Sequence, residues 1–333
     1  MTEMHKVFVT GGTGFVGANL VRLLVQQGYF VYALARANSN LSNLKNIHNV
    51  EIVKGDLNNP DLWQQMVGCQ YLFHVAAHYS LWQKDKDLLY QNNVLGTRNI
   101  LAAAKRAGVE RTVYTSSVAA IGVSEGAVDE THQSPVEELV GEYKKSKYWS
   151  EQEAVRAADQ GQEVVIVNPS TPVGPMDIKP TPTGDDIILR FLRRKMPAYI
   201  DTGLNLIDVR DVAWGHLLAL HKGKSGERYI LGNQNLTLKQ ILDHLAQITN
   251  LPAPDRTIPP WIPYSVAWFD EKILARLGKT PSIPIDGVKM AQHAMYYDAS
   301  KAVRELGLPQ TPVYIALKDA VEWFISQGYV AKN

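Results

Sequence analysis

Short apolar runs alternate with longer amphipathic segments through the first half of the chain. The runs are rich in β-branched and aromatic residues and include KVFVT, FVYALA, VEIVK, QYLFHV, RTVYT and EVVIV. Segments with helical periodicity follow several of them, as in NLVRLLVQQ, PDLWQQMV and NNVLGTRNILAAAKRA. Strands that alternate with helices predict parallel strands joined by crossover helices. We therefore expect an α/β fold built on a doubly wound parallel sheet.

Glycines and a capping pattern indicate where the predicted helices begin and end. Gly28 and Gly108 directly follow the periodic segments LLVQQ and AAAKRA, where a helix-terminating glycine is common. The tetrad SPVE at residues 134–137 has the pattern of a capping box with proline at the first helical position. It predicts a helix that begins before Tyr143.

The composition changes after residue 169. The segment PSTPVGPMDIKPTPTG holds five prolines in sixteen residues, which predicts a loop that leaves the sheet. LIDVRDVAWGHLLALHKG and GERYILG then predict a return to the α/β core, and TLKQILDHLAQITN predicts an amphipathic helix. We therefore expect residues 1–170 with about 205–235 to form one domain. Residues 171–204 and 236–333 would form a smaller domain that is interleaved with it.

Charge and cysteine content narrow the partners and the compartment. Lys and Arg number 34 and Asp and Glu 33, which gives no electrostatic basis for nucleic acid or an anionic membrane as the main partner. The single cysteine, Cys69, excludes an internal disulfide and a thiolate metal site, and it fits a reducing compartment. No stretch approaches the roughly 18 apolar residues of a spanning helix. We expect a soluble, cytoplasmic protein without an integral membrane segment.

The most amphiphilic segment is PPWIPYSVAWFDEKILARLGK at residues 259–279. Helices that lie on membranes usually carry a basic polar face, whereas the charges of this segment alternate in sign. We therefore predict that it packs in the smaller domain rather than on a membrane surface.

Three glycines connect the first predicted strand to the first predicted helix. Gly11, Gly14 and Gly17 are spaced by three residues in KVFVTGGTGFVGANLVRLL. In this context small residues let the backbone approach a pyrophosphate, whose charge then lies at the helix N-terminus. The sequence therefore predicts a Rossmann-type dinucleotide-binding domain.

The second predicted strand bears on which dinucleotide binds. In an NAD site this strand usually ends with an acidic residue that accepts a hydrogen bond from the ribose 2′-hydroxyl. Here Ala35 takes that position and Arg36 follows, with Asn38 and Ser39 close behind. An arginine can bind a 2′-phosphate through charge-assisted hydrogen bonds. We therefore favour NADP(H), while NAD(H), with Arg36 as a solvated loop residue, stays open.

Two pairs of residues four positions apart are candidates for chemistry. Tyr143 and Lys147 in GEYKKSKY would share one face of a helix, where the nearby cation would lower the pKa of the phenol. A solvated basic helix face is the alternative for this segment taken alone.

His74 and His78 lie at the end of a predicted strand without a partner acid or cysteine in the sequence, so we expect no metal site.

The motifs GGTGFVG, GDL, HVAA, NNVLGTRN and TSSVAAIG, followed by Tyr143 and Lys147, occur in a recognisable order and spacing. In this respect the chain resembles the extended short-chain dehydrogenase/reductases, the NAD-dependent epimerase/dehydratase family. The resemblance continues to YYDASKAVRELG near the C-terminus. VNPSTPVGPMDIKPTPTG, MPAYIDTGLNL and GERYILGNQNLTL resemble the dihydroflavonol-4-reductase-like proteins and the bacterial hopanoid-associated sugar epimerases.

The resemblance implies roles for individual residues. Tyr143 would exchange a proton with the substrate oxygen, Lys147 would lower its pKa and bind the nicotinamide ribose, and Ser117 would hydrogen-bond the substrate oxygen. Asn93 would be structural. The implied cofactor-binding residues are Gly11, Thr13, Gly14, Phe15, Val16, Gly17, Arg36, Asp56, Leu57, Ala76, Ala77, Lys147, Asn168, Pro169 and Ser170.

An apolar and aromatic rim favours a reductase. Ordinary core packing is the alternative for any one of its members, which are His78, Tyr79, Leu81, Trp82, Val173, Ile178 and Tyr199. The prediction is an NADP(H)-dependent oxidoreductase of dihydroflavonol-reductase type. It would transfer hydride reversibly between the nicotinamide and a ketone, an aldehyde or a secondary alcohol.

A nucleotide-sugar epimerase or dehydratase with tightly bound NAD(P) stays open as the alternative. The resemblance implies that such enzymes clamp a diphosphate with an arginine followed by Asp-Tyr shortly before the segment DVRDVAWGH. Leu204 and Asn205 stand where that arginine and aspartate would be, although Arg193, Arg194 or Lys195 could replace the clamp.

The expected partner is therefore a small-molecule carbonyl or sugar substrate. The resemblance also implies a possible homodimer through helices around residues 93–107 and 143–158.

Overall fold

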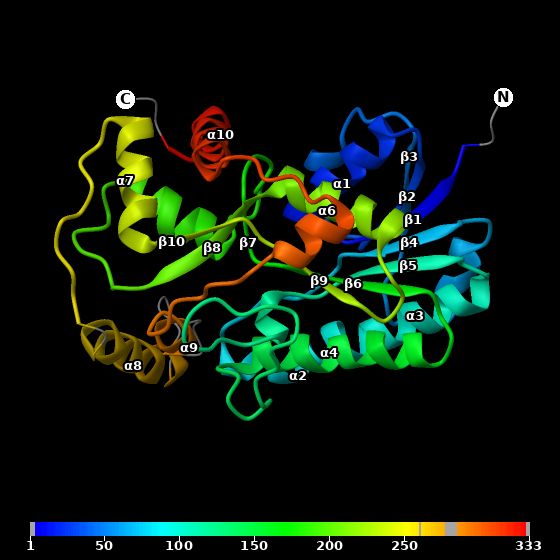
Figure 1. The fold of residues 1–333 in the computed structure, drawn as a ribbon, viewed down its shortest axis with the longest axis horizontal. Coiled ribbons are helices and arrows are strands. Elements are labelled where there is room, and N and C mark those ends of the chain that lie inside the picture. Colours follow the sequence, from blue (N-terminus) through cyan, green and yellow to red (C-terminus); the bar gives the residue numbers. More distant parts are fainter. Residues whose placement is uncertain (1–3, 260, 277–284, 331–333) are drawn as a thin grey trace.

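The computed structural model describes residues 4–259, 261–276 and 285–330 (Figure 1). Seven parallel strands form the main sheet in the order β3-β2-β1-β4-β5-β6-β9. The order reverses beside β1, which has β2 on one side and β4 on the other. This is the predicted Rossmann-type sheet, and the fold class is confirmed. The strands are β1 Lys6–Thr10, β2 Phe30–Ala35, β3 Val50–Lys54, β4 Tyr71–His74, β5 Arg111–Thr115, β6 Val164–Pro169 and β9 Arg228–Leu231.

Helices cover both faces of the main sheet (Figure 1). α1 (Phe15–Gln26) and α6 (Val209–Lys222) pack together on one face, and α3 (Gly96–Ala107) and α4 (Glu142–Asp159) pack together on the other. Successive strand residues point to opposite faces. Val7 and Val9 accordingly belong to the core beneath α1 and α6, whereas Phe8 belongs to the core beneath α3 and α4.

A three-stranded sheet of order β10-β8-β7 forms the smaller part of the molecule. β8 (Gly203–Asp208) pairs in parallel with β7 (Thr171–Val173) and antiparallel with β10 (Gln234–Thr237). Its core includes apolar side chains of α7, α10 and the helical segment formed by η6 and α5. The bounds of these helices are α7 Leu238–Thr249, α10 Val313–Ser326, η6 Thr183–Leu189 and α5 Arg190–Leu192.

Two details of the interleaved region differ from the sequence-based expectation. The proline-rich segment is not entirely loop, because β7 forms within it and contains Pro172. β7 lies at an edge of the small sheet, where a residue without a backbone N–H is tolerated. β8 joins this small sheet, whereas α6 and β9, which follow it, return to the main layers as expected. The domain boundaries themselves stay a prediction.

Helix α4 does not begin at the predicted capping box. Residues 135–139 form turns, and the backbone N of Ser134 donates to the O of Ile121 at 3.0 Å. The helix begins at Glu142 because Gly141, with φ of +86°, sets the chain direction just before it. The prediction that Tyr143 lies on a helix is correct, and the later start places it in the first turn.

Short helical turns connect the larger elements. The helical pattern predicted around residues 61–67 is a single tight turn, η2, and a wider turn, η4, leads directly into α3. The bounds of these two turns and of the other short ones are η1 Ser42–Leu44, η2 Leu62–Met66, η3 Gln83–Asp85, α2 Lys86–Leu89, η4 Tyr90–Leu95, η5 Val118–Ala120 and η7 Ala302–Leu306.

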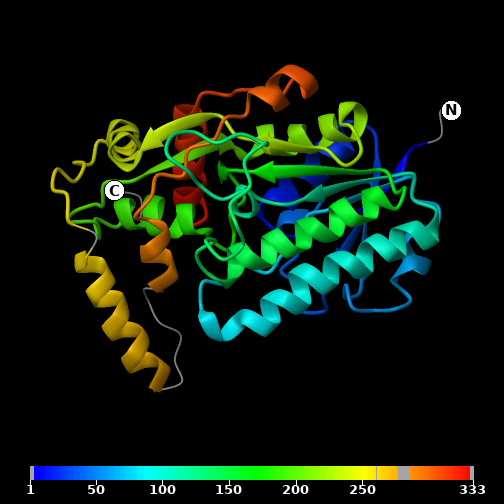
Figure 2. The ribbon, with the colours of Figure 1, turned by 60° about the horizontal axis from the view of Figure 1, so that its bottom comes forward.

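The amphiphilic segment forms α8 (Trp261–Arg276), which packs beside α9 (Ile285–Met290) at one edge of the molecule (Figure 2). A Cβ atom on Gly287 of α9 would lie 3.3 Å from Leu81 of the predicted rim. Trp261 and Phe269 of α8 are 66% and 59% exposed. Among the described residues, no helix is both long and apolar enough to cross a membrane.

Asn205 fastens β8 to two later segments of the chain. Its Nδ2 donates to Asn235 Oδ1 at 2.7 Å and to the O of Tyr297 at 3.1 Å, while its Oδ1 accepts from the N of Asn233 at 3.0 Å. The residue is fully buried. Removal of the amide therefore takes away three hydrogen bonds at a fully buried position, although Asn235 and Tyr297 stay bonded to each other.

We predict that Asn205→Ala lowers the free energy of unfolding by about 2–4 kcal/mol, because three hydrogen bonds worth about 0.5–1.5 kcal/mol each are lost at a fully buried position. Urea denaturation followed by circular dichroism measures the change. Asn99→Ala, at an exposed position of α3, should change stability by less than about 0.5 kcal/mol. Equal losses in the two variants would show that the buried amide has no special role.

Candidate active site

Residues that follow several strands meet at the carboxyl edge of the main sheet. Gly11 follows β1, Arg36 follows β2, Ala76 follows β4, Ser117 follows β5, and Asn168 lies at the end of β6. Doubly wound sheets bind ligands at this edge, next to the point where the strand order reverses. Here that point lies between β1 and β4.

The turn between β1 and α1 packs so closely on itself that two of its glycines are required. Gly11 has φ of +71°, and a Cβ atom on it would lie 2.6 Å from the backbone N of Ala76. A Cβ atom on Gly17 would lie 2.1 Å from the O of Gly11. The N of Gly14 donates to the same carbonyl at 3.0 Å and closes the turn. These contacts fix the distance between the turn and the end of β4.

Gly14 is not required by the chain's own packing. Its φ of −82° suits any residue, and an added Cβ atom would have the O of Gly11 as its nearest neighbour, at 3.4 Å. Gly14 is the N-cap of α1, and within the described part of the chain no side chain caps this helix and no acid lies in its first turn. Its free N–H groups and positive dipole end therefore suit an anion. The turn, with Thr13, Phe15 and Val16, fits a pyrophosphate.

The residues predicted to lie near the adenosine follow adjacent strands. Arg36 and Asp56 are both exposed, and Ala35, in the position of the usual acid, is buried at the end of β2. The carboxylate of Asp56 accepts from the N of Asn58 at 2.9 Å, which orients it, and Leu57 is partly buried beside it. Arg36 forms no ion pair with the residues that the structure describes. Its guanidinium is therefore available to a ligand.

The three predicted catalytic side chains lie together. Ser117 begins η5, and its Oγ accepts from the N of Ala119 at 3.1 Å. Tyr143 lies in the first turn of α4, and the Ser117 side chain is close enough to lower the pKa of its hydroxyl. Lys147 Nζ donates to the O of Thr115, at the end of β5, at 2.9 Å. The end of β5 and the start of α4 thus form one cluster with a hydroxyl, a phenol and an ammonium.

Burial dominates the protonation of this cluster. It raises the pKa of Tyr143 to about 12, against the opposing effect of the nearby Ser117 side chain. It lowers the pKa of Lys147 to about 8, against the opposing charge of Glu151. The pKa of Tyr143 is therefore raised overall, and not lowered as expected, because loss of hydration dominates. At neutral pH Tyr143 is a protonated phenol, which is the form of a proton donor.

Several buried polar atoms at this edge have no hydrogen-bond partner among the described residues. They include Ser116 Oγ, Ser170 Oγ, Asn168 Oδ1 and His78 Nε2. Asn168 uses its Nδ2 to donate to the O of Ser117 at 3.0 Å, so its oxygen is the part left over. Buried polar groups are normally paired. These atoms therefore indicate a polar ligand at the carboxyl edge.

Part of the predicted rim lies beside Tyr143. The ring of Tyr79 meets that of Tyr143 edge-on, with centroids 4.6 Å apart. The N of His78 donates to Asn93 Oδ1 at 2.7 Å, and the O of His78 accepts from Asn93 Nδ2 at 2.9 Å. Asn93 Nδ2 also donates to Ser146 Oγ of α4 at 2.9 Å. Asn93 thereby ties the rim loop to the helix that carries Tyr143.

The other residues of the predicted rim are mainly engaged in contacts within the protein. Val173 is buried on β7, and Tyr199 packs against the same core of the small sheet. The O of Ile178 accepts a hydrogen bond from the hydroxyl of Tyr329. Trp82 is partly buried, with Lys84 Nζ over its ring.

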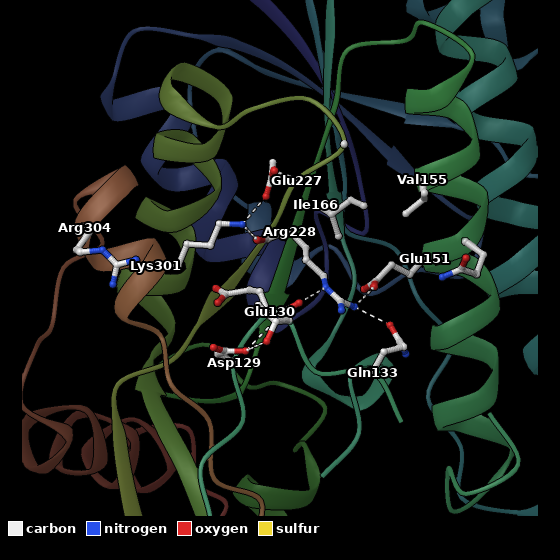
Figure 3. Close-up of a pocket in the computed structure, with 13 residues that line it drawn as sticks. Asp129, Glu130, Gln133, Glu151, Val155, Ile166, Glu227, Arg228, Lys301 and Arg304 are labelled. Atoms are coloured by element: carbon white, nitrogen blue, oxygen red, sulfur yellow. Dashed lines mark hydrogen bonds and ion pairs between the residues drawn. The ribbon is translucent and has the colours of Figure 1, made fainter. Parts of the chain in front are cut away.

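The sequence analysis did not identify two charged residues, Glu151 and Arg228, that are linked to this cluster through Asn168. Asn168 Nδ2 donates to Glu151 Oε2 at 2.7 Å, and Arg228 of β9 donates to Glu151 Oε1 at 3.0 Å. Figure 3 shows Arg228 extended between Glu151 and Gln133 at the wall of a polar cavity of about 520 Å³. The step of four residues from Lys147 to Glu151 was visible in the sequence. The pairing with a residue 77 positions away was not.

His74 has a structural role. Its Nδ1 lies 2.7 Å from Thr10 Oγ1 and its Nε2 lies 3.1 Å from Thr97 Oγ1, so both ring nitrogens are occupied. Burial lowers its pKa to about 3, which keeps the ring neutral. Across the described ranges, no group of three or more His, Cys, Asp or Glu side chains is arranged to hold a metal ion.

The chain matches a known protein family whose members bind a dinucleotide. Residues 7–232 match the NAD dependent epimerase/dehydratase family, which covers more than half of the chain. The chain belongs to that family. This epimerase/dehydratase family member is an NAD(P)-dependent oxidoreductase.

Individual relatives match this family member over nearly its whole length. A protein of Synechocystis sp. named "Putative dihydroflavonol 4-reductase" is 67% identical over 329 residues, which cover 97% of this chain and 95% of that protein. Sterol demethylase protein B of Methylococcus capsulatus is 36% identical and covers 97% of this chain and 99% of its own. The crystal structure of gox2253 has a TM-score of 0.86 and 41% identity, and covers 98% of this chain and 99% of that one.

The residues at the carboxyl edge fit the NAD(P) that the epimerase/dehydratase family implies. The uncapped start of α1 suits the pyrophosphate, and the unpartnered Asn168 Oδ1 and Ser170 Oγ suit polar groups of the nicotinamide half. Lys147 of α4 bonds the carbonyl of Thr115 at the end of β5, and Asn168 at the end of β6 bonds the carbonyl of Ser117.

We predict that Gly14→Ala weakens NADPH binding by at least about tenfold and leaves the melting temperature unchanged, since the added methyl clashes only with a bound phosphate. Isothermal titration calorimetry and a thermal melt measure the two effects. Gly17→Ala should instead lower the melting temperature, because its Cβ atom would overlap the Gly11 carbonyl. A Gly14→Ala protein that binds NADPH normally would remove this turn from the cofactor site.

Proposed function

We propose that this protein is an NADP(H)-dependent carbonyl reductase of dihydroflavonol-reductase type. The observation that carries the proposal is the cluster of Tyr143, Ser117 and Lys147 at the carboxyl edge of a dinucleotide-binding sheet. The substrate is a ketone or an aldehyde, and in the reverse direction a secondary alcohol.

The chain's own residues bind and protonate the substrate oxygen. The bound nicotinamide supplies hydride to the carbonyl carbon. Ser117 and Tyr143 hold the carbonyl oxygen between their hydroxyl groups, and Tyr143 transfers its proton to that oxygen as it becomes an alcohol. The raised pKa of Tyr143 keeps the phenol protonated before this step. Lys147, held by the carbonyl of Thr115, stabilises the phenolate that remains.

The surroundings of Tyr143 favour an apolar substrate. The rings of Tyr79 and Tyr143 pack edge to face, and Tyr79 is 43% exposed, so it presents an aromatic surface beside Tyr143. The names of two relatives refer to a dihydroflavonol and a sterol, both of which are ring compounds. We therefore infer that a cyclic or aryl ketone is reduced here.

The contacts of the possible diphosphate clamp support a reductase over a nucleotide-sugar epimerase. Asn205, in the place of the expected acid, is fully buried in structural hydrogen bonds. Arg193 donates to Asp185 and to the O of Tyr329, which holds it beside the C-terminal segment.

The proposal also includes a homodimer that forms through α3 and α4. Trp149 of α4 is 45% exposed, so it is an apolar side chain that such an interface would cover.

We predict that Tyr143→Phe lowers kcat roughly 10³-fold, because the proton donor is lost, and leaves NADPH affinity unchanged. The assay follows NADPH absorbance with a panel of a dihydroflavonol, a 3-ketosteroid and aryl aldehydes. Tyr148→Phe, on the same helix, is the matched control and should keep wild-type turnover. Failure of the wild type to reduce any member of the panel, or normal turnover by Tyr143→Phe, would count against the proposed function.

We also predict that Arg36→Ala raises the Kd for NADPH by about 10- to 100-fold and the Kd for NADH by less than about threefold. A charge-assisted contact to the 2′-phosphate is worth roughly 1.5–3 kcal/mol, and NADH lacks that phosphate. Fluorescence titration with both nucleotides measures the two constants. Similar losses for both would place Arg36 away from the 2′ position.

A further inference from the structure

Glu151 shares a buried face of α4 with the catalytic cluster. Tyr143, Lys147 and Glu151 follow one another at intervals of four residues, so their side chains lie above one another along the helix. The Glu151 side chain is only 2% exposed. A buried carboxylate is costly unless it is paired, so its partners show what it is for.

One oxygen of Glu151 acts on the end of β5 through Asn168. Asn168 Nδ2 donates to Glu151 Oε2 at 2.7 Å and to the O of Ser117 at 3.0 Å. Asn168 is fully buried at the end of β6. The carboxylate therefore fixes the orientation of the Asn168 amide, and the amide fixes the main chain of Ser117. It also leaves Asn168 Oδ1 aimed away from Glu151, without a partner in the described chain.

The other oxygen of Glu151 is bound by Arg228, whose guanidinium is fixed by several further hydrogen bonds. Arg228 donates from Nη1 to Glu151 Oε1 at 3.0 Å and to Gln133 Oε1 at 2.8 Å. Its Nε donates to the O of Glu130 at 2.8 Å and its Nη2 to the O of His132 at 2.9 Å. Figure 3 shows this guanidinium enclosed between α4 and the loop that contains Gln133. Arg228 thus holds Glu151 in one rotamer.

We propose that Glu151 is a positioning residue that acts on Lys147 and Ser117 together. Its carboxylate supplies the negative charge that keeps the buried Lys147 ammonium ionised, and its bond to Asn168 sets the main chain that carries the Ser117 hydroxyl. The inference rests on the proposed roles of Ser117, Tyr143 and Lys147.

The other groups that face Lys147 do not provide a counter-charge. His74 of β4 is neutral, with a pKa lowered to about 3 by burial and by Lys147 itself. Tyr114 of β5, whose hydroxyl lies 3.4 Å from Lys147 Nζ, has a pKa raised by burial and is also neutral. Tyr143 is protonated at neutral pH. Within the described ranges, Glu151 is thus the carboxylate that opposes the desolvation of Lys147.

The direction of the effect follows from these charges. Burial lowers the pKa of Lys147 to about 8, and Glu151 raises it. Without the carboxylate the pKa falls further, so the ammonium loses its proton at a lower pH. Activity that needs a charged Lys147 then declines at a lower pH, and the basic limb of the pH–rate profile moves toward neutrality.

The first experiment is a pH titration of the protein labelled with [13C]lysine, in which Lys147→Arg identifies the resonance of Lys147. Glu151→Gln should move the titration midpoint of Lys147 down by about one pH unit. Glu153→Gln is the matched control, because Glu153 lies on the same helix and pairs with Arg98 and Arg156 instead. An unchanged midpoint in a folded Glu151→Gln protein would overturn the proposal.

Loss of Glu151 strands the Arg228 cation, so folding needs its own control. The double variant Glu151→Gln with Arg228→Gln removes that stranded charge and should show the same lowered midpoint. Its unchanged midpoint would overturn the proposal in the same way.

The second experiment measures the pH dependence of kcat with whichever member of the carbonyl panel is reduced. The basic limb should move down by about one pH unit in Glu151→Gln and stay in place in Glu153→Gln. A parallel loss at every pH would indicate a structural role and overturn the proposal. If the wild type reduces no carbonyl, the proposed function fails, and the titration of Lys147 still decides the role of Glu151.

Discussion

The polar face that α4 buries against the main sheet constrains the rest of the structure. Ser146, Lys147, Ser150 and Glu151 of this helix are all nearly inaccessible to solvent. A buried polar group without a partner costs about 1–3 kcal/mol, and a charged one costs more. Each of the four therefore has a partner on another element, and α4 can occupy only the position that satisfies all of them.

Those partners come from most of the main domain. Ser146 bonds with Asn93 before α3, Ser150 bonds with Tyr114 of β5, Lys147 bonds with the carbonyl of Thr115, and Glu151 bonds with β6 and β9. These hydrogen bonds fix the position of α4 on the sheet, and the position of α4 in turn fixes where Tyr143 and Lys147 lie. Such preorganisation is what a proton donor and an oxyanion-stabilising group require.

Sequence patterns predicted the features that depend on local chemistry. The strands of the main sheet, the glycine turn and the helical spacing of Tyr143 and Lys147 can all be read from short stretches of the sequence. The capping box failed because Ser134 is engaged with Ile121 and Gly141 has a left-handed backbone. β7 was missed because tolerance of Pro172 depends on an edge position that only the finished sheet defines.

The pKa of Tyr143 was predicted in the wrong direction for a related reason. Proximity of a lysine is visible in the sequence, but the depth of burial is a property of the whole fold. The same limit concealed Arg228, whose contact with Glu151 forms only when β9 joins the sheet.

The connection between the two sheets has a mechanical consequence. β6 ends at Pro169 and β7 begins at Thr171, so a single residue, Ser170, separates a strand of the large sheet from a strand of the small one. The two prolines beside this joint, Pro169 and Pro172, have fixed φ angles. A linker this short and stiff leaves little slack for one sheet to swing as a rigid body against the other. The ends of β6 and β7 are therefore held in register with each other, so the side chains that follow β6 keep a fixed position relative to the small sheet.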